Sequence, residues 1–262
     1  MWERRSRMYN IIRSVNYTLR RDILVLVTIF AMITLPVIVL FAGNDYSVHE
    51  MTGSLYFATM EDIYIVFLIA ILILASKCCA ADAADKTINY ELMSGHRRAS
   101  VYWSRIIVGF VWSVLIVSVC YMLPIGYMTL ANGLGNSVAI SDMVLRLSLI
   151  GLVTFRIAAF IMMIATILRS PGKSIALGYI MIMVVSMFSM FSEDSFEEGN
   201  WANYLSGLAK VLELANFKEV GEKIFDASLS GTIVVCTVVS SLVCITVYLV
   251  IGCVAFVRKD RD

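Results

Sequence analysis

The sequence predicts an all-α polytopic membrane protein, in which six transmembrane helices follow an N-terminal amphipathic interfacial helix and two short outer helices lie between spans five and six. The composition is the first observation: of 262 residues, 60% are hydrophobic and 16% charged. Mean hydropathy is +0.83, too apolar for a soluble domain. The second is a set of six apolar runs, and the third is the clustering of Lys and Arg between alternate runs. We treat residues 1–262 as one transmembrane domain.

Residues 1–22 are predicted to form the amphipathic helix on the inner leaflet, with arginines toward lipid phosphates. The competing interpretation is a signal peptide, but the next apolar run is long enough for a full span and no small-residue cleavage pattern follows it. The arginines are Arg4, Arg5, Arg7, Arg13, Arg20 and Arg21, and the apolar face has Met8, Ile11, Ile12, Val15 and Leu19.

The six apolar runs approach or exceed the roughly 20 residues that a helix needs to cross a hydrocarbon core. They are residues 23–42, 63–80, 106–130, 147–168, 174–191 and 232–257. Six spans put both termini on one side, and the segments on that side, 1–22, 77–105, 169–173 and 258–262, hold 16 of the 21 Lys and Arg residues. The positive-inside rule therefore predicts a multi-pass protein of the cell membrane with both termini in the cytoplasm.

Residues 192–231 are the longest outer connection and carry two helical apolar patterns. We expect two amphipathic helices that lie at the outer boundary or cap a cavity; the alternative is a pair of plain surface helices. The first pattern contains Trp201, Tyr204, Leu205, Leu208, Val211, Leu212 and Ala215, and the second contains Phe217, Val220, Ile224 and Phe225.

Residues with catalytic or metal-binding chemistry form no convincing set. Pro171-Gly172-Lys173-Ser174 has the end of a phosphate-binding loop, but Ile167 stands where its first glycine belongs. Asp82 and Asp85 have the spacing of a metal–diphosphate motif, but the second acidic pair that such a site needs is missing from the inner side. A solvated helix end is the favoured interpretation. The six cysteines lie in or near apolar runs, which favours small buried hydrophobes over disulfides or metal ligands. We expect no cofactor or metal, no enzymatic activity, and, at net charge +1, no nucleic-acid partner.

Arg156 lies in the middle of the fourth apolar run. A cation at that depth is costly against lipid, so it should face the bundle interior, a partner subunit or a water-filled cavity. It is a candidate for a transport pathway. The structural alternative is an interhelical bond to a hydroxyl such as that of Ser113, Ser118 or Ser186.

Residues 81–105 are the long polar connection between the second and third runs. We expect a short helix that ends at Gly95 and is followed by Arg97 and Arg98. A short helix of this kind can insert into a groove of another protein.

The layout and this segment together resemble the permease subunit of an ABC-2 type ABC transporter, an exporter family. The resemblance covers nearly the whole chain in layout. Its local signature runs from Lys86 to Arg98, KTINYELMSGHRR, and continues through Val101-Tyr102-Trp103-Ser104-Arg105 into the third run.

The resemblance implies a second permease copy or paralogue and two copies of a separate ATP-binding subunit, which binds ATP and Mg. It implies that residues 81–105 supply a coupling helix for that ATPase. The implied contacts are Tyr90, Glu91, Leu92, Met93, Gly95, Arg97 and Arg98, with Arg169 and Lys173 as a second, smaller contact.

The expected function is therefore export of an amphipathic or hydrophobic cargo, by analogy an antimicrobial peptide or a drug. A Met-rich and aromatic face on the fifth run suits such a cargo, although lipid-facing packing is the alternative. This face contains Met181, Met183, Met187, Phe188 and Met190. The other functions considered are a non-catalytic membrane sensor or immunity protein and a gradient-driven transporter, which the absence of Asp and Glu from the runs disfavours.

Overall fold

The structure is a computed structural model that describes residues 2–42, 52–58, 64–84, 93, 95, 97–195, 220, 224–225, 229 and 231–258. Every regular element in these ranges is an α-helix, so the predicted all-α class holds for the described residues. The helices are α1 (Trp2–Arg21), α2 (Ile23–Ala42), α3 (Gly53–Ala58), α4 (Tyr64–Ala84), α6 (Arg98–Asn132), α7 (Ile140–Leu168), α8 (Pro171–Ser195) and α11 (Gly231–Arg258).

Three helices, α6, α7 and α11, are long and apolar enough to cross a membrane. Shorter apolar stretches occupy Ile23–Thr34 in α2, Phe67–Ala81 in α4 and Pro171–Met187 in α8. The fold is thus compatible with a membrane protein. The count of six spans stays a prediction.

Several helices extend beyond the apolar runs from which they were predicted. Helix α6 begins at Arg98 rather than Ile106, and α7 begins at Ile140 rather than Leu147. Backbone hydrogen bonding continues a helix into polar sequence, whereas hydropathy registers only its apolar part. The polar connection predicted as residues 81–105 is consequently shortened, and Arg105 lies inside α6.

Helix α7 is the centre of the bundle and packs against α4, α6, α8 and α11. Glycines permit two of the close approaches. A Cβ on Gly109 of α6 would lie 2.6 Å from Met162 Sδ, and one on Gly178 of α8 would lie 2.7 Å from Ile161 Cδ1. Both glycines therefore allow helices to contact α7 more closely than any larger residue would.

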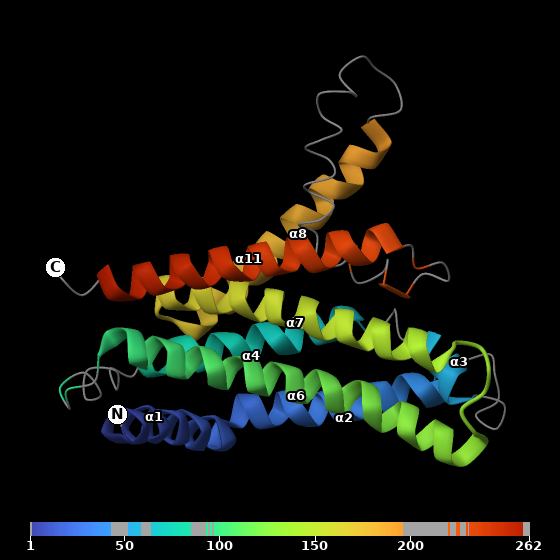
Figure 1. Cartoon of the computed structure of the whole chain (residues 1–262), viewed down its shortest axis with the longest axis horizontal. Coiled ribbons are helices and arrows are strands. Elements are labelled where there is room, and N and C mark those ends of the chain that lie inside the picture. Colours follow the sequence, from blue (N-terminus) through green and yellow to red (C-terminus); the bar gives the residue numbers. More distant parts are fainter. Residues whose placement is uncertain are drawn as a thin grey trace.

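The two ends of the chain lie at the same end of the bundle (Figure 1). The α7–α8 turn and the start of α6 are at this end too, and α3 and the α6–α7 connection are at the other. Helix α8 leans away from the other helices toward its C-terminal end (Figure 1). This arrangement agrees with termini on one side, and the cytoplasmic location of that side is a prediction from charge.

Helix α1 covers the neighbouring helices with its apolar face. Ile11, Val15 and Leu19, spaced four residues apart, are each less than 5% exposed, and α1 packs chiefly against α6. The indole Nε1 of Trp112 in α6 donates to the Asn16 side-chain oxygen at 2.9 Å. The apolar stripe of this predicted interfacial helix is thus buried against protein.

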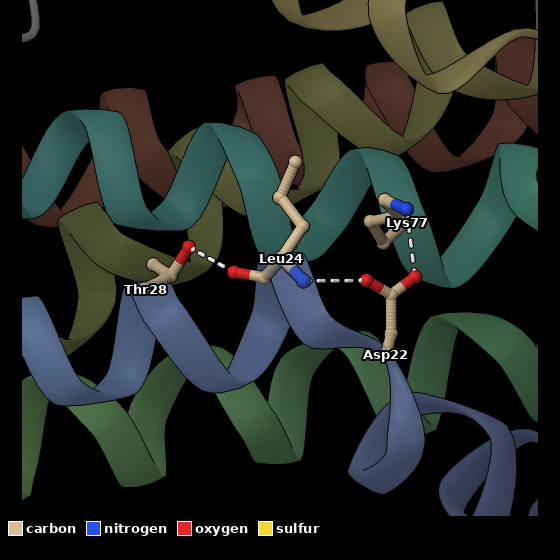
Figure 2. A network of polar contacts seen from close by, with 4 residues as sticks. All are labelled: Asp22, Leu24, Thr28 and Lys77. Atoms are coloured by element: carbon tan, nitrogen blue, oxygen red, sulfur yellow. Dashed lines mark hydrogen bonds and ion pairs between the residues drawn. The ribbon is translucent and has the colours of Figure 1, made fainter.

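The junction of α1 and α2 is held by Asp22 (Figure 2). One carboxylate oxygen accepts the Leu24 amide at 2.9 Å, which caps the start of α2, and the other pairs with Lys77 Nζ of α4 at 2.6 Å. Partial burial acts to raise the pKa of Asp22, but the bond to Lys77, its charge and the backbone amides outweigh burial and lower the pKa. The carboxylate therefore ties both helices to α4.

Helix α3 docks on the C-terminal end of α6. The amides of Gly53 and Ser54 donate to the carbonyls of Gly133 and Leu134 at 3.1 and 2.7 Å. Gly133 and Gly135 have φ of 83° and 73°, a left-handed conformation that suits glycine. This turn brings residues 52–58 against α6, where Tyr56 and Phe57 are buried.

The cysteines are free, as expected, and three of the six are buried: Cys78, Cys79 and Cys120. The Cys120 thiol donates to the Met32 carbonyl at 3.2 Å, which joins α6 to α2. Cys236 is exposed, so the expectation of buried small hydrophobes fails there because its face of α11 has no neighbour among the described residues.

Candidate functional site

The end of the bundle that holds both chain termini, predicted from charge to be the inner end, carries the described part of the predicted coupling contact. Tyr90, Glu91 and Leu92 lie outside the described residues. Met93 is helical and 83% exposed. Gly95 has φ of 83° in an exposed turn, which fits the expectation that a helix ends there.

Arg97 and Arg98, predicted to act together, differ in environment. Arg97 is exposed and precedes the first residue of α6. Arg98 is half-buried, and its Nη1 lies 3.4 Å from the Val257 carbonyl, a long and weak hydrogen bond to α11. One turn on, Tyr102 donates to the Leu249 carbonyl at 3.0 Å. Arg98 thus belongs to the α6–α11 contact more than to the free surface.

Arg169 and Lys173 lie at the same end of the bundle, in the α7–α8 turn. Arg169 adopts a left-handed conformation with φ of 52°, and its amide donates to the Ala165 carbonyl at 2.9 Å, closing α7. Lys173 is exposed in the first turn of α8. The exposed cations available to a partner here include Arg97 and Lys173.

Three arginines are buried inside the helical bundle: Arg105, Arg146 and Arg156 are 2%, 5% and 0% exposed. A buried cation costs several kcal/mol unless polar groups compensate it. Only Arg156 was singled out from sequence. The other two were missed because they lie just outside the predicted apolar runs. Each lies inside a helix that begins earlier than hydropathy predicts, and packing against other parts of the chain buries it.

Arg156 lies near the middle of α7, about 18 Å from the inner end of the helix at 1.5 Å per residue. It interacts electrostatically with Tyr248 of α11. One turn later Phe160 packs on the Tyr248 ring, with centroids 5.3 Å apart. The predicted placement toward the bundle interior is observed. Among the hydroxyls considered as partners, that of Ser113 donates to the Gly109 carbonyl of its own helix.

Arg146 joins α7 to the second predicted outer helix. Its Nη1 donates to the Ile224 carbonyl at 2.9 Å, and the bond is buried. Val220, Ile224 and Phe225 are helical and buried. Three of the four residues in that predicted apolar pattern therefore face the bundle, while Phe217 and the first predicted outer helix lie outside the described ranges.

An aromatic cluster lies beside this anchor. The Phe225 ring stacks on Tyr121 of α6, with centroids 6.3 Å apart and planes at 20°, and packs on Phe57 of α3 at 5.8 Å. Phe67 of α4 joins the cluster by packing on the Tyr121 ring, with the two centroids 4.6 Å apart. The cluster lies where α3, α4 and α6 meet residue 225.

A cavity of about 250 Å³ lies between α6 and α7, next to Tyr121. Its wall is mostly aliphatic, with hydroxyl groups. The lining residues are Val114, Val117, Ser118, Tyr121, Met122, Leu147, Ser148, Ile150, Gly151 and Thr154. The hydroxyls of Ser148 and Thr154 donate to carbonyls of their own helix. Such a wall suits an apolar group better than a charged one.

Met181, Met183 and Met187, expected to line a cargo path, lie on α8 and are not among the residues that line this cavity. Met181, Met183 and Met187 are 44%, 40% and 56% exposed, and the side chains of Phe188 and Met190 lie outside the description. Exposure agrees with the lipid-facing alternative. Within the residues described, no group of His, Cys, Asp or Glu could hold a metal ion.

Comparison with known families places the chain in one family. A family model described as "Protein of unknown function (DUF2705)" matches residues 23–261. The chain belongs to the DUF2705 family. The match begins at the first residue of α2, so α1 precedes the matched region. A search of curated proteins found no match.

Proposed function

We infer that this DUF2705 protein is the transmembrane permease subunit of an ATP-driven exporter of the ABC-2 type, with ATP hydrolysis in a separate partner chain. It acts as a multi-pass protein of the cell membrane with cytoplasmic termini. The observation that carries the proposal is the exposed inner-end surface of Met93, Gly95, Arg97 and Lys173 on a helical bundle that is apolar along its length.

A second argument is the position of polar groups. Energy must enter such a bundle through a partner or through an ion gradient. Gradient coupling uses acidic side chains inside the bundle, whereas the charged side chains buried among the described residues are arginines. Docked ATPase subunits acting on the inner end fit this distribution better.

The cavity between α6 and α7 is smaller than a drug-sized site. A drug-sized site occupies roughly 300–1,000 Å³, and the α6–α7 cavity holds about 250 Å³. We propose that a pathway for an amphipathic peptide or drug is formed together with a second permease chain. The exposed apolar faces of α8 and α11, which contain Met187 (56%) and Val243 (57%), are available to contribute to it.

The packing of the bundle favours a second candidate function. A bundle whose interior is filled by α7 and in which aromatic rings pack together beside α3 would suit a membrane sensor or immunity protein that transports nothing. This candidate predicts no stoichiometric ATPase.

Purification of the tagged full chain from its native membrane in mild detergent tests the proposal. A copurifying ATP-binding subunit and ATP hydrolysis in the eluate are expected. A single chain without ATPase, under conditions in which a known exporter complex stays intact, would refute the exporter and favour the sensor.

A docking variant then tests the surface. Glu91→Lys with Leu92→Asp should release the ATPase while the helical circular dichroism is unchanged. The control is Lys173→Gln, which alters the smaller predicted contact and should weaken copurification less. Full retention of the ATPase by the double variant would remove residues 91 and 92 from the contact.

A further inference from the structure

The outward face of α1 is a surface that the proposed transport function does not use. Since the apolar stripe of α1 is buried against α6 and its neighbours, the opposite face is free of the bundle. At about 100° per residue, five side chains lie within about 120° of one another on the side opposite the stripe. They are Tyr9, Arg13, Tyr17, Arg20 and Arg21.

All five of these side chains are exposed. Tyr9 and Tyr17 are 63% and 57% exposed. The Arg21 guanidinium lies over the Tyr17 ring, 4.4 Å from its centroid, so one cation is held by an aromatic side chain. The face is both positively charged and aromatic.

The level of this face is set by the helix that follows. Two residues after Arg21, α2 begins to expose apolar side chains: Ile23, Val27 and Phe30 are 76%, 60% and 70% exposed. In a membrane these belong among acyl chains, and Figure 1 shows α1 and α2 following each other along one side of the bundle. Arg20 and Arg21, two or three residues before Ile23, then lie where acyl chains end and headgroups begin, and Arg13 lies about two helical turns farther along α1.

We propose that this face of α1, Tyr9-Arg13-Tyr17-Arg20-Arg21, binds the headgroups of anionic phospholipids in the inner leaflet. Arginine forks match phosphate oxygens, and tyrosine is favoured at the membrane–water boundary. An acidic protein would need to reach a surface that adjoins the lipid-facing side of α2 directly. The lipid headgroup fits both the charge and the position.

The attachment of α1 to the bundle makes the site specific. The Trp112–Asn16 bond and the Asp22–Lys77 pair fix α1 relative to α6 and α4. The helix therefore presents its arginines from one position on the bundle. The inference requires that the chain resides in a membrane; it does not require that the chain transports anything.

The test uses the purified full chain in neutral detergent, with native mass spectrometry to measure binding of phosphatidylglycerol and phosphatidylcholine. The wild type should bind phosphatidylglycerol more tightly. Arg13→Gln, Arg20→Gln and Arg21→Gln together should weaken that binding by about fivefold per arginine, roughly 100-fold in all, and leave phosphatidylcholine binding unchanged. Excess inorganic phosphate should not displace the lipid.

The matched control removes three other cations from the same end of the bundle, through Arg97→Gln, Lys173→Gln and Arg258→Gln. All three are exposed, and this variant should keep wild-type lipid binding. Equal loss in the two triple variants would show that overall charge, not the α1 face, attracts lipid, and would overturn the proposal. Wild-type lipid binding by the α1 variant, displacement by phosphate alone, or preference for polyglutamate over phosphatidylglycerol would each overturn it too.

Discussion

Replacing Phe225 tests whether the outer segment is held to the bundle by its aromatic contacts. The ring is 6% exposed and contacts both Tyr121 and Phe57. Truncation of a buried Phe to Ala costs about 3–5 kcal/mol. Since each 1.4 kcal/mol is about tenfold in an equilibrium constant, local opening around Phe225 should become at least about 100-fold more frequent in Phe225→Ala.

Amide hydrogen exchange of peptides that contain residues 224–225 measures this opening directly. Phe225→Leu is the matched variant because it keeps most of the apolar volume and loses the ring contacts, worth about 0.5–1.5 kcal/mol for an aromatic pair. Exchange should therefore rise about tenfold in Phe225→Leu. Wild-type exchange in Phe225→Ala, with the helices intact, would refute the idea that this ring anchors the segment.

Three further predictions concern other parts of the bundle. Arg156→Leu should leave assembly intact and abolish export if Arg156 lines the pathway, and unchanged export would remove it from the mechanism. The Asp22–Lys77 pair should contribute its full stability above the ordinary carboxyl pKa of 3.8, because the folded-state pKa is lower. This contribution is lost as the pH falls through that lower value; thermal unfolding of Asp22→Asn should lack this acid-sensitive part, and an identical pH profile would contradict the pairing. Gly178→Leu should destabilise α8 packing by about 1–3 kcal/mol, since its Cβ would meet side chains at 2.7 and 2.9 Å, whereas Gly172→Leu, with open space, should unfold at a temperature closer to wild type.

Much of the fold could be predicted from sequence because helix content and hydropathy are local properties. The first apolar run coincides with α2, and the N-terminal pattern coincides with α1. The ends of α6 and α7 could not be predicted in the same way. Hydropathy changes sign inside each helix, while the helix itself ends where its hydrogen bonds end.

The candidate site was predicted unevenly for a similar reason. Arg156 is conspicuous because apolar residues surround it on both sides. Arg146 and Arg105 are not, and their burial depends on residues far away in sequence, such as Ile224, 78 positions from Arg146. The coupling residues 90–92 stay a prediction.

The sequence by itself determined the helical content and the concentration of positive charge on alternate segments, and it predicted a membrane protein, since each of these follows from composition along short windows. Only the tertiary structure decided what the helices face. It covers the apolar stripe of α1 with α6, pairs Asp22 with Lys77 across 55 positions, and encloses three arginines. These outcomes depend on which surfaces meet, and no local pattern of residues specifies that.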